Sequence, residues 1–184
     1  LFGLLTDANV HASLEHLKAL IKLAGQENIS FNLHLITDGR DSPPRSASNL
    51  LTQIPKEKLA SVSGRYYAMD RDKHWDRTQL AYQVLTGDGP LIDIADLESH
   101  IKKSYERKLN DEYVVPTLVG PASAEASAGK PEKCGVKDGD ALVFFNFRED
   151  RMRQIAEAFV NKNFDKFSVK PYSNLFIATM INYD

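Results

Sequence analysis

Short apolar runs alternate along the chain with longer stretches in which apolar residues recur every three or four positions. Runs of strand length occur at residues 1–5, 31–36, 59–63, 114–119, 141–145 and 175–181. Helical periodicity occurs at residues 13–26, 74–86, 92–107 and 149–161, and a short helix is expected after Pro44. This alternation predicts an α/β layered domain with a mostly parallel central sheet flanked by helices.

Three segments carry further predictions about organisation. The fully apolar run at 141–145 is typical of a strand at the centre of a sheet. Residues 120–139 are rich in Gly, Pro and small polar residues, which predicts a surface loop or insertion rather than a domain linker. Both ends of the chain have the pattern of buried strands, so we expect residues 1–184 to be a single domain cut from a longer protein.

Composition excludes several classes of protein. The net charge of −2 argues against a nucleic-acid binder, which usually carries a basic excess. Cys134 is the single cysteine, so no internal disulfide can form. The sequence contains no run of about 18 apolar residues, so no membrane span is predicted. No basic segment precedes an apolar stretch, so no signal peptide is predicted. The expected location is the cytoplasm.

Arg residues are gathered in short segments, whereas Lys residues are spread along the chain. The sequence has nine Arg and fourteen Lys. Eight of the nine Arg fall in three segments, which hold Arg40 and Arg45; Arg65, Arg71 and Arg77; and Arg148, Arg151 and Arg153. A guanidinium grips phosphate or carboxylate with paired hydrogen bonds, while an ammonium acts as a mobile point charge. Clustered Arg therefore indicates a fixed anion site.

Each Arg segment comes directly after a predicted strand. Because the carboxyl ends of parallel strands line the ligand crevice of α/β sheets, the three segments are expected to converge on one pocket. Asp residues are interleaved with the Arg, so a purely structural network of ion pairs is the alternative. Nucleic-acid binding through the aromatic residues near Arg71 is a weaker alternative, because the same Asp residues would repel phosphates.

Individual residues suggest roles within that pocket. Asp41 follows Arg40 in the turn after residues 31–36, and a carboxylate held near a cation can accept a proton or a hydroxyl hydrogen bond. Arg148 and Arg151 are expected in the first turn of a helix, where backbone amides add to a phosphate site. His11 lies between a predicted strand and a helix, where an imidazole can reach a ligand or be structural. The five His lack close ligand spacing, so no metal site is predicted.

Four motifs follow one another along the chain, namely LLTDANVHAS, TDGRDSPP, GRYYAMDRDKHWDR and FNFREDRMR. Together they resemble motifs of the cofactor-independent phosphoglycerate mutases of the bacterial type. That family typically shows LLSDGGVHSH, TDGRDTPP, GRYYAMDRDxRWxR and FNFRxDRxR in this order. The resemblance extends over essentially the whole chain.

The resemblance implies a two-domain isomerase of glycolysis and gluconeogenesis that interconverts 3-phosphoglycerate and 2-phosphoglycerate. This chain would be its substrate-binding, phosphotransferase domain, without cofactors of its own. A phosphatase-like domain of the same polypeptide would hold two divalent metals, manganese in many members, and the serine that becomes phosphorylated. The whole enzyme is expected to be monomeric, and the fragment alone inactive.

The resemblance also implies roles for seven residues. The expected substrate-binding residues are His11, Arg40, Asp41, Arg65, Arg71, Arg148 and Arg151. Arg148 and Arg151 would bind the phosphoryl group, and Arg65 and Arg71 would hold the glycerate. Asp41 would be the acid and base for the two hydroxyls, with Arg40 orienting it.

The sequence departs from the family at the turn before His11. The family's Ser-Asp-Gly-Gly is Thr6–Asn9 here, and Asn9 is one of the residues that best tolerates a positive φ. The turn is therefore expected to keep its shape. A non-catalytic domain that binds phosphorylated acids, or a degenerate relative, is the alternative to an enzyme.

Overall fold

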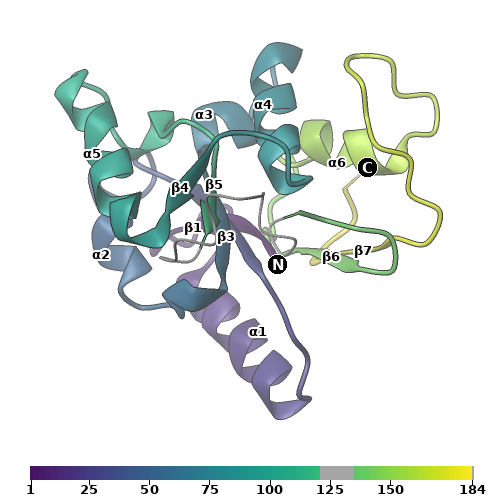
Figure 1. Cartoon of the computed structure of the whole chain (residues 1–184), viewed down its shortest axis with the longest axis horizontal. Coiled ribbons are helices and arrows are strands. Elements are labelled where there is room, and N and C mark those ends of the chain that lie inside the picture. The colour runs from purple at the N-terminus through teal and green to yellow at the C-terminus, as the bar shows by residue number, and fades with distance from the viewer. Residues whose placement is uncertain (121–134, 184) are drawn as a thin grey trace.

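A seven-stranded sheet forms the centre of residues 1–120 and 135–183, which are the residues that the computed structural model describes (Figure 1). The strands are β1 (Phe2–Leu5), β2 (Leu33–Thr37), β3 (Leu59–Gly64), β4 (Leu91–Asp93), β5 (Thr117–Gly120), β6 (Ala141–Phe144) and β7 (Phe176–Thr179). Their order is β4-β5-β3-β2-β1-β6-β7, and only the β3–β5 pair is antiparallel. The predicted α/β fold with a mostly parallel sheet is confirmed.

Helices surround this sheet in Figure 1, with α2 and α5 on one side of the view and α4 and α6 on the other. The α-helices are α1 (Leu14–Gln26), α2 (Ala47–Leu51), α3 (Arg65–Ala68), α4 (Trp75–Leu85), α5 (Leu97–Glu106) and α6 (Arg153–Val160). Three short 3-10 helices are η1 (Lys56–Lys58), η2 (Ile94–Asp96) and η3 (Asp111–Tyr113). None of the described helices is long and apolar enough to cross a membrane.

The core lies along β1, β2 and β3, in which every residue is buried. Strands that are covered on both faces read as continuous apolar runs, as Phe2–Leu5 does. On α1, the buried residues Leu14, Leu17 and Ala24 are spaced at helical intervals and form the face toward the sheet. These strands and this helix were all predicted from the apolar pattern.

Two expectations about burial are wrong. Residues 141–144 form β6, which lies second from the edge of the sheet, and Ala141 is exposed. The final strand, β7, is an edge strand whose Phe176 is 68% exposed. An apolar run shows that a segment suits a strand, but it does not show how many neighbours that strand has.

Other boundaries also differ from the prediction. The helix expected at 92–107 begins instead with β4 and η2, because the Asp93 carboxylate accepts the backbone N–H of Ala95 at 2.8 Å and starts the 3-10 turn. The short helix α3 was not predicted. Of the loop expected at 120–139, Gly120 ends β5, residues 135–139 contain no helix or strand, and the other residues lie outside the described ones.

Candidate functional site

Four neighbouring strands, β3, β2, β1 and β6, run parallel and end at the same side of the sheet. β1 leads into the segment with His11, β2 into the turn with Arg40, β3 into Arg65 and β6 into Arg148. The prediction that each Arg segment follows a strand is therefore confirmed. The crossover at β1, where the chain order changes direction, is where α/β sheets open a crevice for ligands.

The turn after β2 is organised by the buried carboxylate of Asp38, which is 1% exposed. Its Oδ1 accepts the backbone N–H groups of Arg40 at 3.2 Å and Asp41 at 3.1 Å. Its Oδ2 accepts the Thr6 hydroxyl at 2.6 Å and the backbone N–H of Ser42 at 3.0 Å. Burial alone would raise the pKa of Asp38, but these hydrogen bonds outweigh burial and hold the pKa below its usual value.

Asp38 was missed by the sequence analysis, which assigned the acid of this turn to Asp41 alone. The available signal was its place directly after a buried strand and directly before Gly39, which has a φ of 69°. An Asp at that position typically accepts the backbone amides of the following turn. Asp38 therefore fixes the positions of Arg40 and Asp41.

Arg65 is the cation that holds Asp41. Its guanidinium donates from Nη1 to Asp38 Oδ1 and to Asp41 Oδ2, both at 2.6 Å, and the residue is 4% exposed. Burial opposes the charge of Arg65, yet the two carboxylates raise its pKa above the usual value. Arg40 was expected to orient Asp41, but its Nη1 lies 3.3 Å from Glu112 Oε2 instead. In the structure, Arg65 rather than Arg40 contacts Asp41.

His11 lies between two carboxylates and is 3% exposed. Its Nε2 is 3.9 Å from Asp41 Oδ2, and its Nδ1 is 3.6 Å from Asp150 Oδ1. Burial lowers the pKa of His11, and the charge of Arg65 lowers it further, so the neutral imidazole is favoured. In the turn before it, Asn9 has a φ of 56°, a left-handed conformation that Asn tolerates better than most residues.

Asp150 joins the second and third Arg segments. Its Oδ2 accepts a hydrogen bond from Arg71 Nη1 at 2.5 Å, and its Oδ1 lies 3.0 Å from Arg148 Nε. Arg151 donates from Nη1 to the carbonyl oxygen of Met69 at 3.2 Å. The prediction that Arg148 and Arg151 open a helix is wrong, because α6 begins at Arg153. Arg148 lies in the irregular segment after β6, and Arg151 lies in the turn just before α6.

Positive charge dominates around Arg151. Burial lowers the pKa of Arg151, and neighbouring guanidinium groups lower it further, namely those of Arg71, Arg65 and Arg40. Like charges gathered in this way repel one another, and the nearby Asp150 carboxylate only partly offsets them. The excess of guanidinium groups around Arg151 therefore favours an anionic ligand.

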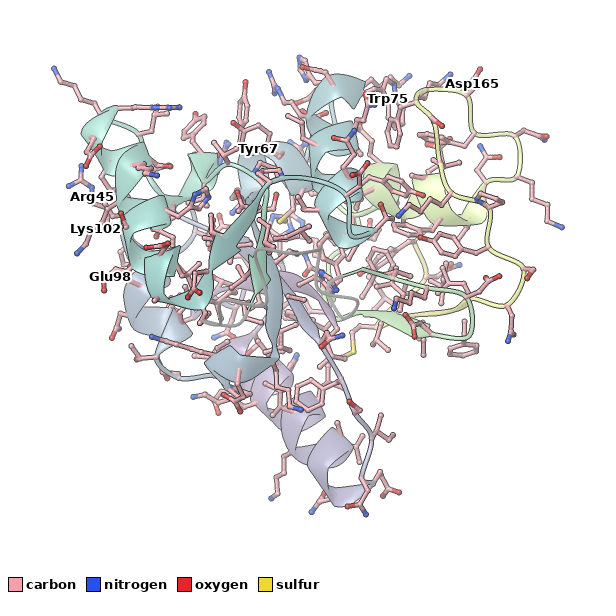
Figure 2. The ribbon with its side chains drawn as sticks, in the orientation of Figure 1. Arg45, Tyr67, Trp75, Glu98, Lys102 and Asp165 are labelled. Atoms are coloured by element: carbon pink, nitrogen blue, oxygen red, sulfur yellow. The ribbon has the colours of Figure 1, made fainter. Side chains whose placement is uncertain are left out.

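The remaining three clustered Arg contact side chains outside the group formed by Arg65, Arg71, Arg148 and Arg151. Arg45 stacks on the Tyr105 ring at 4.8 Å, on the side of α5 where Glu98 and Lys102 are labelled in Figure 2. Arg77 lies 4.0 Å over the Tyr66 ring. Arg153 donates to Glu149 at 3.0 Å on the exposed face of α6.

One group among the described residues has the composition of a metal site, although no metal site was predicted. Asp70, Asp72 and His74 bring one possible ligand atom each within 4.8 Å of one another. The Asp70 carboxylate already accepts hydrogen bonds from the backbone N–H groups of Asp72 and His74 and from Gln154 and Arg77. These donors satisfy its lone pairs, so the group fits a hydrogen-bonded turn rather than a metal ligand set.

Comparison with known proteins gives the same family along the whole chain. Residues 1–184 match the family described as BPG-independent PGAM N-terminus. The chain is 43% identical over 192 residues to 2,3-bisphosphoglycerate-independent phosphoglycerate mutase 1 of Methanosarcina barkeri, covering 100% of this chain and 36% of that protein. It is also 43% identical to the 2,3-bisphosphoglycerate-independent phosphoglycerate mutase of Clostridium tetani, covering 100% of this chain and 36% of the relative.

A solved structure supports the fold. The crystal structure of Leishmania mexicana phosphoglycerate mutase at low cobalt concentration superposes with a TM-score of 0.82 and 26% sequence identity, over 99% of this chain and 35% of that one. The chain thus spans about a third of the length of the relatives it matches. Sequence and fold agree that this chain belongs to the family of BPG-independent phosphoglycerate mutase N-termini.

Proposed function

We propose that this chain is the substrate-holding part of a 2,3-bisphosphoglycerate-independent phosphoglycerate mutase, and that it binds 2- and 3-phosphoglycerate at the carboxyl ends of β1, β2, β3 and β6. The observation that carries the proposal is the meeting of three Arg segments around Arg151, whose pKa the neighbouring guanidinium groups lower. A phosphoglycerate carries a phosphate and a carboxylate, so it offers anionic groups to more than one guanidinium.

Phosphoryl transfer needs positioning and charge neutralisation above all, and these residues can supply both. Arg148 and Arg151 bind the phosphoryl group, while Arg65 and Arg71 hold the glycerate. Fixed guanidinium groups lose little entropy when a ligand binds, and Arg65 is already fixed by two hydrogen bonds at 2.6 Å. The site is thus preorganised on the side of β2 and β3.

Asp41 is the proposed acid and base for the two hydroxyl groups of the glycerate. Its Oδ2 lies 2.6 Å from Arg65 Nη1 and 3.9 Å from His11 Nε2, so a cation orients it and an imidazole stands beside it. A carboxylate held in one orientation can accept a hydroxyl proton and return it to the other oxygen. Arg40, more than half exposed, adds positive charge at the mouth of the site.

The phosphoserine and the two divalent metals of this mechanism belong to the remaining polypeptide of the longer enzyme, the proposed partner domain. When bound there, the metals neutralise charge on the transferred phosphoryl group. Asp70, Asp72 and His74 do not fit that role, since hydrogen bonds occupy the Asp70 carboxylate. This chain contributes the residues that bind the substrate.

An activity measurement on the polypeptide that carries this chain tests the proposal. Asp41→Asn should lower kcat for the conversion of 3-phosphoglycerate to 2-phosphoglycerate by about a hundredfold or more, because the base is lost while its shape is kept. Asp72→Asn is the matched control, as Asp72 is exposed and lies in a neighbouring loop. Equal activities of the two variants would remove the acid–base role from Asp41.

A further inference from the structure

Asp150 lies between Arg71 and Arg148, two of the four Arg that the proposed function assigns to the ligand. Its carboxylate accepts a hydrogen bond from Arg71 at 2.5 Å and lies 3.0 Å from Arg148 Nε. Arg71 and Arg148 come from different strand ends, and Asp150 is the anion that they share. In this state the protein's own carboxylate takes the contacts that a phosphate or carboxylate of the ligand would need.

His11 offers Asp150 a second partner. His11 Nδ1 and Asp150 Oδ1 are both buried and lie 3.6 Å apart. Neither atom takes part in a hydrogen bond, although Asp150 Oδ1 lies 3.0 Å from the charged Arg148 Nε. A distance of 3.6 Å is too long for a hydrogen bond, and a buried polar atom without one is unfavourable. A small movement of the Asp150 carboxylate toward His11 would satisfy both atoms.

Charges around His11 are consistent with such a movement. The groups that face it are Arg65 from α3, Asp41 from the turn after β2, and Arg148 and Asp150 from the segment after β6. Burial and the Arg charges favour the neutral imidazole, which can carry its single proton on either nitrogen. A carboxylate on Nδ1 fixes that proton there.

We propose, on the basis of the proposed function, that Asp150 exchanges partners when the site takes up an anionic phosphate group: it leaves Arg71 and Arg148 to the ligand and accepts the Nδ1–H of His11. Asp150 is then a positioning residue for His11. The exchange leaves His11 Nε2 without the proton and facing the Asp41 side, where it can accept a hydrogen bond from a hydroxyl of the ligand.

Calorimetric titration with inorganic phosphate, on the chain and on two variants, tests the exchange. Asp150→Asn removes the competing negative charge, so it should bind phosphate about tenfold more tightly than the unaltered chain, equal to about 1.4 kcal/mol. Glu149→Gln is the matched control, because Glu149 is the adjacent carboxylate and pairs with Arg153 rather than with Arg71 or Arg148. Its affinity should change by less than about twofold.

A nitrogen-15 NMR measurement on the histidines of the unaltered chain keeps the test independent of how the variants fold. Adding phosphate should produce a hydrogen-bonded Nδ1–H signal for His11 that Glu149→Gln also shows. Phosphate binding without that signal, or with equal affinities in Asp150→Asn and Glu149→Gln, would overturn the exchange alone. No binding of phosphate or 3-phosphoglycerate by any folded form would instead remove the anion site and the proposed function with it.

Discussion

Gly64 and Glu112 approach each other so closely that a methyl group on Gly64 would lie 2.2 Å from the carbonyl oxygen of Glu112. The backbone N–H of Gly64 also donates to the carbonyl of Val114 at 2.7 Å. Gly64 is the last residue of β3 and immediately precedes Arg65, while Glu112 is the partner of Arg40. This contact therefore couples the positions of two proposed site residues.

Gly64→Ala should destabilise the protein by about 2 kcal/mol or more, because backbone atoms rather than a flexible side chain must move to admit the methyl group. Gly25→Ala in α1 is the matched control, since a methyl group there meets nothing within 4 Å. It should stabilise the protein by about 0.5–1 kcal/mol, the usual preference for Ala within a helix. Urea unfolding measures the free energy of unfolding of both variants. Equal values for Gly64→Ala and Gly25→Ala would contradict the close contact.

Asp38→Asn should cost about 3 kcal/mol of unfolding free energy. The substitution keeps the size of the side chain but removes the charge that faces buried Arg65 at 2.6 Å, and breaking a buried ion pair is expensive. Asp72→Asn, at an exposed carboxylate, should change stability by no more than about 0.5 kcal/mol. Chemical denaturation compares them. An Asp38→Asn variant as stable as Asp72→Asn would show that Asp38 does not organise the site.

His34 should make stability depend on pH. It lies buried in β2, its Nδ1 is 2.9 Å from the Ser61 hydroxyl, and burial lowers its pKa from 6.5 to about 3. In the unfolded chain His34 is protonated as the pH falls below about 6.5, whereas in the folded chain it stays neutral down to about pH 3. The free energy of unfolding therefore decreases as the pH falls from 6.5 toward 3. From pH 7.5 to pH 5 the loss from this group is about 2 kcal/mol.

The difference between the unaltered chain and His34→Gln isolates that contribution, because burial lowers the pKa of His11 and His100 as well. Unfolding free energies measured from pH 7.5 to pH 5 should decline less steeply for His34→Gln. Parallel profiles would mean that His34 accepts a proton in the folded protein without penalty.

The sequence was sufficient for the elements whose apolar period is strong. β1, β2, β3 and α1 are buried where the pattern predicts, and the strand ends bring the Arg segments together. Sheet position was not predictable, because the antiparallel pairing of β5 and the exposed edge at β7 depend on contacts between distant segments. Local pattern cannot report those contacts.

For the candidate site, too, some features could be predicted from the sequence and others could not. Residue type and strand ends were enough to select the three Arg segments, and the family resemblance chose Arg65, Arg71, Arg148 and Arg151 among their eight Arg. Which cation meets which carboxylate was not predictable, since Arg65 and Asp41 are 24 positions apart and Arg71 and Asp150 are 79 apart. Adjacency in sequence suggested the Arg40–Asp41 pair, but the side chain of Arg40 turns to Glu112. Asp38 was not predicted as a site residue, because most of its hydrogen-bond partners are backbone N–H groups, which any residue type can supply.

Calorimetric titration of the folded chain with 3-phosphoglycerate tests the anion site most directly. We predict one saturable site that weakens about tenfold or more in Arg148→Ala and in Arg151→Ala, since each loses a charge-assisted hydrogen bond to the ligand. Arg153→Ala, which removes the same charge from the exposed pair with Glu149, should bind as the unaltered chain does. Absence of binding, or the same weakening in all three variants, would contradict a phosphoglycerate site at these strand ends.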